Sequence, residues 1–228
     1  MNEDLQSIAQ SDPNYFKTPA KNIFLISPVR VSTPEIEEEV RKVIQERNEK
    51  GRSVYYPLED TYQKNDPTGL RIVRDNRDGI IGSDWVEIFY KSGSKGSIFD
   101  LGMSLMAGKR VYSANLGELF KFPRDKDPED VQVKRFILKY GKYLENSSEL
   151  YDYAQELKQT LPKTPVFEIE WKGKNSKNLM ELGMAYVSQY FNNTQIILAN
   201  PEQVQRTEGK SFENILLRFH EDYLNSKK

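Results

Sequence analysis

The chain has 228 residues, of which 37% are hydrophobic and 29% charged, and its formal net charge is −1 at pH 7. This composition predicts a globular protein with a full core, and the near-zero charge gives no global field that would recruit nucleic acid or an acidic membrane surface. The chain has no cysteine, which excludes disulfides, a thiolate nucleophile and a zinc–thiolate site. Its one histidine, His220, is expected at the surface, so neither a His-based triad nor a metal site is expected.

The first 20 residues are polar and contain no apolar segment, which predicts a flexible N-terminal arm and not a signal peptide. No apolar run approaches the roughly 20 residues that a membrane span needs. We therefore expect a cytoplasmic protein with no membrane partner and no specific nucleic-acid partner.

Residues 21–115 alternate between short apolar runs, which predict buried strands, and segments with helical spacing of apolar residues. Strands alternating with helices are typical of parallel βαβ units. We therefore predict an α/β fold with a doubly wound, mostly parallel sheet of the Rossmann or flavodoxin type. The predicted strands are 22–28, 52–58, 85–91 and 110–115, and the predicted helices are 32–51, 67–84 and 96–108.

The second half of the chain begins differently. Residues 116–163 are highly charged and helical in pattern, which predicts a helical insertion. Residues 164–228 return to a strand–helix–strand pattern and end in a predicted helix, giving a C-terminal βαβα extension. This extension either completes the same sheet or forms a partial repeat.

A four-residue motif occurs almost twice. Residues 100–103 read Asp-Leu-Gly-Met and residues 181–184 read Glu-Leu-Gly-Met, 81 positions later. Glu87 and Glu168 have the same separation, so the similarity covers one strand–helix–strand unit. Two interpretations are open: similar packing needs of two βαβ units, or an internal duplication.

Ligands of open parallel sheets bind outside the carboxyl ends of the strands. Polar residues follow the first two predicted strands, and a Gly- and Ser-rich loop precedes the helix at 96–108, whose N-terminal N–H groups could hold a phosphate. Tyr55, Tyr56 and Tyr90 either stack on a base there or belong to the core. The candidate binding residues are Ser27, Arg30, Tyr56, Ser94, Gly96 and Ser97.

Asp100 lies one turn inside the same predicted helix. It either points back into the crevice as a catalytic acid or is a first-turn acid that the helix dipole favours.

The segment SGSKGSIFDLGMSLMAGKRV at 92–111, together with FLISPVR at 24–30, resembles the nucleoside 2-deoxyribosyltransferase superfamily, which includes the 2'-deoxynucleoside 5'-phosphate N-hydrolases. The resemblance covers about residues 22–115. The positions that fit the family pattern are Gly96, Leu101, Gly102, Gly108 and Lys109.

The resemblance implies a carboxylate that stabilises or attacks C1' of the sugar, at the position of Asp100. The family has Glu there, which is one methylene longer. A second family carboxylate falls on Asn76, unless a one-residue shift lets Asp75 serve. Ser94 and Arg30 match the residues that bind the 5'-phosphate in the nucleotide hydrolases. The reaction needs no cofactor, and self-association as a homodimer is a reasonable expectation because family members often share sites across a dimer.

The resulting hypothesis is an enzyme that cleaves or transfers the N-glycosidic bond of a (deoxy)nucleotide or nucleoside. The alternative is a catalytically silent nucleotide-binding protein, and a third reading is an interaction scaffold. Glu181 is the candidate carboxylate of a second site, but Lys177 stands where the upstream loop would need a glycine.

Overall fold

A computed structural model of the chain describes residues 20–61, 70–89, 91, 94–114, 147–173, 175–192, 194–200 and 202. The predicted N-terminal arm apart from Ala20, the terminal helix with His220, Tyr90 and most of the predicted helical insertion lie outside these residues.

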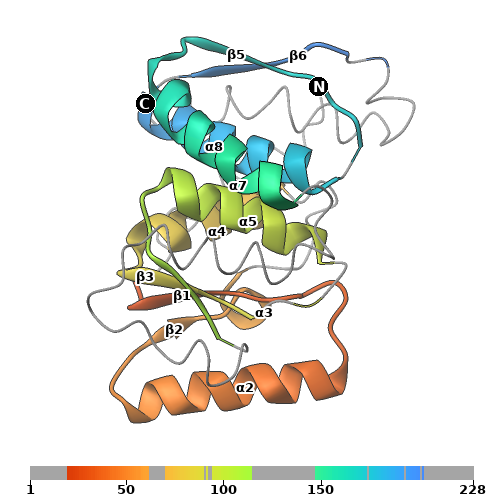
Figure 1. Cartoon of the computed structure of the whole chain (residues 1–228). Coiled ribbons are helices and arrows are strands. Elements are labelled where there is room, and N and C mark those ends of the chain that lie inside the picture. The colour runs from red at the N-terminus through yellow and green to blue at the C-terminus, as the bar shows by residue number, and fades with distance from the viewer. Residues whose placement is uncertain are drawn as a thin grey trace, which may run out of the picture.

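The first sheet has four parallel strands in the order β2-β1-β3-β4. Helices flank it on both faces, which confirms the predicted α/β fold with a parallel sheet (Figure 1). The strands are β1 (Ile23–Ile26), β2 (Val54–Tyr55), β3 (Trp85–Ile88) and β4 (Val111–Ser113), and the helices are α2 (Pro34–Glu49), α3 (Pro57–Asp60), α4 (Leu70–Gly82) and α5 (Lys95–Met106).

Strand β1 shows why a continuous apolar run indicates a sheet covered on both faces. Ile23 and Leu25 pack in a cluster with residues of α2, whereas Phe24 and Ile26 pack in a second cluster that includes residues of α4 and α5. Alternate residues of the strand thus reach opposite faces of the sheet. Thr33 caps α2, because its Oγ1 accepts a hydrogen bond of 3.4 Å from the backbone N–H of Ile36.

The C-terminal extension does not complete the first sheet. Strands β5 (Val166–Ile169) and β6 (Gln195–Leu198) form a separate parallel sheet. Helix α7 (Ser147–Thr160), a short 3₁₀ turn (Leu161–Lys163) and helix α8 (Ser176–Asn192) belong to this half. Figure 1 shows the resulting layers in order: α2, the first sheet, α4 with α5, α7 with α8, and the second sheet. None of the helices that the structure describes is both long and apolar enough to cross a membrane.

The repeat is larger than the motif predicted. The first repeat unit runs α4-β3-α5-β4, and the second runs α7-β5-α8-β6 in the same order. Their strand registers match: Val86 pairs with Val111, and the residues 81 and 85 positions later, Phe167 and Ile196, pair in the second sheet. The partial repeat is therefore the interpretation that the structure supports, and α7 belongs to it although its residues fall in the predicted insertion.

Equivalent hydrogen bonds close both repeat units. Lys109 Nζ, just before β4, donates to the carbonyls of Ile81 and Ser83 at 2.8 and 2.6 Å, at the end of α4. Thr194, just before β6, donates through Oγ1 to the carbonyl of Leu161, after α7, at 3.2 Å. In each unit a side chain just before the last strand thus satisfies a carbonyl at or just after the end of the unit's first helix, α4 or α7.

Helices α5 and α8 touch through their glycines. A Cβ added to Gly102 would lie 2.3 Å from the carbonyl oxygen of Met180, and one added to Gly183 would lie 2.2 Å from that of Phe99. Phe99 and Met180 are equivalent in the repeat, so the two contacts are reciprocal, as in an interface with two-fold symmetry. The Leu-Gly-Met motif is repeated because each copy supplies the glycine of this contact.

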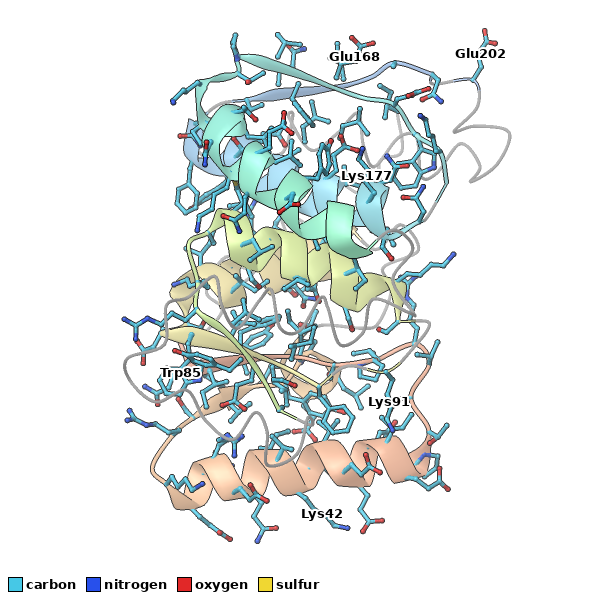
Figure 2. The ribbon with its side chains drawn as sticks, in the orientation of Figure 1. Lys42, Trp85, Lys91, Glu168, Lys177 and Glu202 are labelled. Atoms are coloured by element: carbon cyan, nitrogen blue, oxygen red, sulfur yellow. The ribbon has the colours of Figure 1, made fainter. Side chains whose placement is uncertain are left out.

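The outer faces of the two sheets differ. Glu87 of β3 is 1% exposed and accepts hydrogen bonds of 3.0 and 3.1 Å from Nε of Arg47 on α2. Its equivalent Glu168 in β5 is exposed and points outward (Figure 2). Helix α2 therefore covers the outer face of the first sheet at Glu87, whereas the equivalent position of the second sheet, Glu168, is exposed to solvent.

A methyl group at either contact glycine should weaken the fold. We expect Gly102→Ala and Gly183→Ala each to lower the free energy of unfolding by about 2 kcal/mol or more, because backbone atoms that meet the new Cβ move only if the helices separate. Gly96→Ala is the matched control, since a Cβ at this position of α5 meets nothing within 4 Å. Urea unfolding measures the difference. Equal stability of the Gly102→Ala and Gly96→Ala proteins would contradict the close helix contact.

Candidate functional site

Asp100 belongs to α5, and its side chain reaches α4 on the side of the first sheet away from α2. Its side chain is buried, with 8% of the residue exposed. Its Oδ2 accepts a hydrogen bond of 3.2 Å from Nδ2 of Asn76 on α4. Oδ1 accepts no hydrogen bond from the described residues. The structure thus brings two of the three predicted catalytic residues into direct contact.

The hydrogen bonds continue beyond Asn76. Thr61, at the end of α3, donates through Oγ1 to Oδ1 of Asn76 at 2.9 Å, and the hydroxyl of Tyr55 lies 2.8 Å from the same Oγ1. All four side chains are buried. Tyr55, Thr61, Asn76 and Asp100 therefore form one buried polar chain that joins β2, α3, α4 and α5.

Burial raises the pKa of Asp100 to about 7, and the hydrogen bond from Asn76 opposes this rise. A carboxyl with such a pKa exists in both the neutral and the ionised form at neutral pH. Groups of this kind are common where a carboxyl takes part in chemistry.

The predicted phosphate-binding residues lie at the carboxyl edge of the first sheet. Ser27 follows β1, is 7% exposed, and its Oγ has no hydrogen-bond partner among the described residues. Ser94 and Ser97 begin α5, and their hydroxyls are 2.7 Å apart. Arg30 is exposed and Gly96 has open space around it, so both are accessible to a ligand. This edge combines hydroxyls, helix N–H groups and a cation, which suits an anion.

The remaining predicted site residues are Tyr56 and Asp75. Tyr56 packs with Ile23 and Leu25 in the cluster on the α2 face of the sheet, opposite the face of Asp100. Tyr55 points to the Asp100 face and stacks on Phe24 with ring centroids 5.1 Å apart. Asp75 contacts Nε of Arg71 at 3.8 Å, and its charge contributes to the raised pKa of Tyr55. The alternation of side chains along a strand could have separated the two tyrosines from sequence alone.

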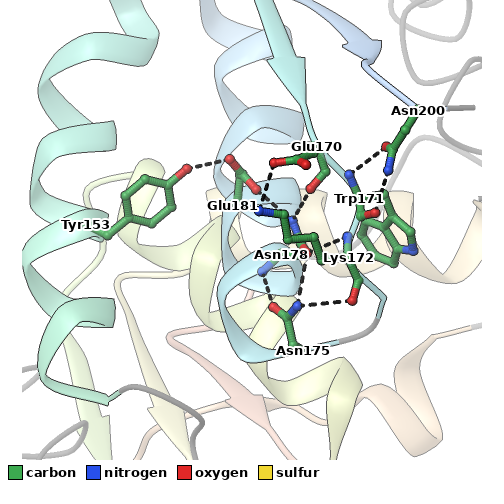
Figure 3. A network of polar contacts seen from close by, with 8 residues as sticks. All are labelled: Tyr153, Glu170, Trp171, Lys172, Asn175, Asn178, Glu181 and Asn200. Atoms are coloured by element: carbon green, nitrogen blue, oxygen red, sulfur yellow. Dashed lines mark hydrogen bonds and ion pairs between the residues drawn. The ribbon is translucent and has the colours of Figure 1, made fainter. Parts of the chain in front are cut away.

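Glu181 occupies the equivalent position in the second repeat unit and is 7% exposed. Tyr153 of α7 donates to its Oε1, and Nδ2 of Asn178 donates to Oε2 at 3.0 Å (Figure 3). Burial raises the pKa of Glu181, and these two hydrogen bonds oppose the rise. Each unit therefore pairs a buried acid with a donor from the preceding helix: Asn76 in the first and Tyr153 in the second.

The loop beside Glu181 is held by asparagines. Asn200 donates to the carbonyl of Trp171 at 2.8 Å and accepts from its N–H at 2.9 Å. Asn178 donates to the carbonyl of Glu170 and accepts from the N–H of Lys172 (Figure 3). These side chains act as extra backbone pairings after β5. Both oxygens of Glu181 and the amides around it thus form hydrogen bonds within the chain, whereas among the described residues only one oxygen of Asp100 does.

Within the described ranges, no three histidine, aspartate or glutamate side chains gather closely enough to hold a metal ion. Comparisons of the chain with protein-family models, with curated proteins and with solved structures found no match. The resemblance to the deoxyribosyltransferases therefore remains a prediction.

The pKa of Asp100 predicts how stability depends on pH. The folded-state pKa of about 7 lies above the ordinary value of 3.8, so the folded protein binds this proton more tightly than the unfolded chain. Stability from this group is present at low pH and is lost as pH rises toward 7.

We expect Asp100→Asn, which cannot ionise, to be more stable than the unmodified protein by about 3 to 4 kcal/mol at pH 8, with the difference vanishing near pH 4. Chemical denaturation across this pH range measures it. The same substitution at an exposed position, Asp152→Asn, serves as the control. A pH-independent difference for Asp100→Asn would show that the acid is not selectively destabilised when ionised.

Proposed function

We propose that this protein acts on the N-glycosidic bond of a (deoxy)nucleotide or nucleoside, as a hydrolase or a deoxyribosyltransferase, with Asp100 as the reacting carboxylate. One observation carries the proposal: a buried acid, fixed through Oδ2 by Asn76 and with no hydrogen bond to Oδ1 from the described residues, lies on the helix that begins at the carboxyl edge of a parallel sheet. Clefts at this edge are the usual ligand sites of such folds.

Cleavage of an N-glycosidic bond requires a carboxylate near C1' of the sugar. Breaking the bond between C1' and the base nitrogen leaves positive charge on the sugar, and the base departs with the bonding electron pair. Oδ1 of ionised Asp100 either stabilises that charge or bonds to C1', and water or a second base then takes the sugar. Burial strengthens the electrostatic interaction, because little water screens it.

The anion-binding edge favours a nucleotide over a nucleoside. Arg30 supplies an exposed positive charge, and the unpartnered hydroxyl of Ser27 and the hydroxyl pair at the start of α5 supply hydrogen-bond donors. A 5'-phosphate would satisfy these groups while the sugar lies toward Asp100.

The side-chain length of Asp100 favours one alternative, a catalytically silent nucleotide-binding protein. The family that the chain resembles has a longer acid at this position, and a carboxylate placed about an angstrom too far from C1' loses about a hundredfold in rate. The same experiment separates the two functions.

The test is to incubate the protein with a panel of nucleotides and nucleosides and to measure released base by chromatography. We expect release that increases as pH rises through about 7, because the ionised form of Asp100 reacts. Asp100→Asn should lower release by about a hundredfold or more. Arg30→Ala should raise KM for nucleotides about tenfold, through loss of a charge-assisted contact. Glu181→Gln is the control and should retain the activity.

Base release that persists in Asp100→Asn would exclude this assignment of the reacting acid. Binding that Arg30→Ala abolishes, without base release from any substrate, would establish the silent binding protein. Absence of both binding and release would exclude both functions.

A further inference from the structure

We propose that Thr61 is a positioning residue that holds the side-chain amide of Asn76 in one orientation, with its N–H groups toward Asp100. The inference deepens the proposed function, because it concerns the same carboxylate. No motif singled out Thr61, which follows the short helix α3 and enters the site only through the fold.

The hydrogen bonds fix the direction of the chain. Thr61 has a single hydroxyl proton, and it is donated to Oδ1 of Asn76 at 2.9 Å. The hydroxyl of Tyr55, 2.8 Å away, must then donate to Thr61. With Oδ1 of Asn76 occupied in this way, Nδ2 faces Asp100. Both hydroxyl protons then have an acceptor, and Asp100 accepts from the amide at the end.

The opposite direction leaves a donor unsatisfied. If Asp100 donated to Oδ1 of a turned amide, Nδ2 would donate to Thr61 and Thr61 to Tyr55. The phenolic proton of Tyr55 would then need an acceptor, and no other acceptor contacts this hydroxyl among the described residues. Burial raises the pKa of Tyr55 far above neutral, so the phenol keeps its proton. An unpaired buried hydroxyl costs free energy, which favours the first direction.

The amide of Asn76 also prevents proton transfer between Asp100 and the other hydrogen-bonded side chains, Thr61 and Tyr55. An amide donates hydrogen bonds but does not pass a proton on, so no proton moves between Tyr55 and Asp100 through Asn76. Asp100 therefore exchanges its proton through Oδ1, the oxygen with no partner in the described part of the chain. The hydrogen-bonded series from Tyr55 to Asn76 therefore orients the carboxylate of Asp100 and does not relay protons to it.

Charged groups of α3 and α4 also lie near these side chains: Asp60, Asp75 and Asp78 contribute to the raised pKa of Tyr55. On α4, Asp75 contacts Arg71, and Arg77 pairs with Asp78 at 2.7 Å. Arg77 also donates to the hydroxyl of Tyr186 on α8 at 3.2 Å. Burial is the main cause of the raised pKa of Asp100, and the hydrogen bond from the amide of Asn76 opposes it.

The experiment measures the pKa of the Asp100 carboxyl by carbon-13 NMR, with the signal assigned through Asp100→Asn. Tyr55→Phe removes the first donor but keeps the bond from Thr61 to Asn76, so the pKa of Asp100 should stay unchanged. The double variant Tyr55→Phe with Thr61→Val frees the amide to turn and leaves no buried hydroxyl unpaired. We expect it to raise the pKa by about one unit, and Thr61→Ser to leave it unchanged.

An unchanged pKa in the double variant would overturn the proposal, and a lowered pKa would show that the amide faces the other way. Asn76→Asp is a second, independent variant that tests the same geometry. Two carboxyl groups about 3 Å apart share one proton, so Asp100 should titrate in two coupled steps, one below and one above its present pKa. A single unshifted step would contradict the contact.

Base release separates this inference from the proposed function. If unmodified protein releases no base while the double variant shows the raised pKa, the positioning role of Thr61 stands and the proposed function fails. If release occurs, the double variant should shift its pH profile upward by the same amount as the carboxyl pKa, whereas a merely structural role would lower the rate at every pH.

Discussion

The close contact of α5 and α8 is the constraint on which the rest of the structure depends. The backbone of each helix touches the glycine of the other, through the carbonyl oxygens of Phe99 and Met180. The buried acids, Asp100 and Glu181, directly follow these two residues, so one contact sets the depth of both acids in their units. Side chains larger than hydrogen at the glycines would push the helices apart and move both acids. The contact also covers the glycine-bearing face of α5 with the chain's own second repeat, so that face is not free for a second copy.

The two repeat units share a frame but not a role. Among the described elements only the first unit has β1 and β2 beside it, and β2 and the following α3 bring Tyr55 and Thr61 to Asn76, which contacts its acid. The second unit has a two-stranded sheet, and its longer acid reaches a tyrosine on α7. An acid with both oxygens occupied by the chain contributes packing and hydrogen bonds. An acid with one oxygen uncommitted can also meet a ligand. We therefore interpret the second unit as structural: its helix α8 packs against α5 and holds it in place.

Much of the fold could be predicted from the sequence. Buried strands have continuous apolar runs, and in helices the apolar residues recur with a period of about 3.6 residues. The repeat motif was visible through its constant separation of 81 positions. The role of α7 could not be predicted, because α7 matches α4 in its position in the unit and not in its residues. Its buried face is formed by Leu150, Ala154 and Leu157. The split into two sheets depends on which strand edges pair, and strand composition does not encode this. Thr61 could not be predicted as part of the site, because only the turn after α3 brings it to Asn76.

The two departures from the family pattern at the site are chemically linked. Asn76 and Asp100 are in contact, so a second carboxylate at position 76 would place two acids within hydrogen-bond distance in a buried space. Two such acids cannot both be ionised, and the burial of one charge already raises the pKa of Asp100 to about 7. An amide at position 76 donates a hydrogen bond to the carboxylate without adding a charge. The short acid and the amide therefore form a matched pair with a single buried charge, and a change at either position alters the ionisation of the site as a whole.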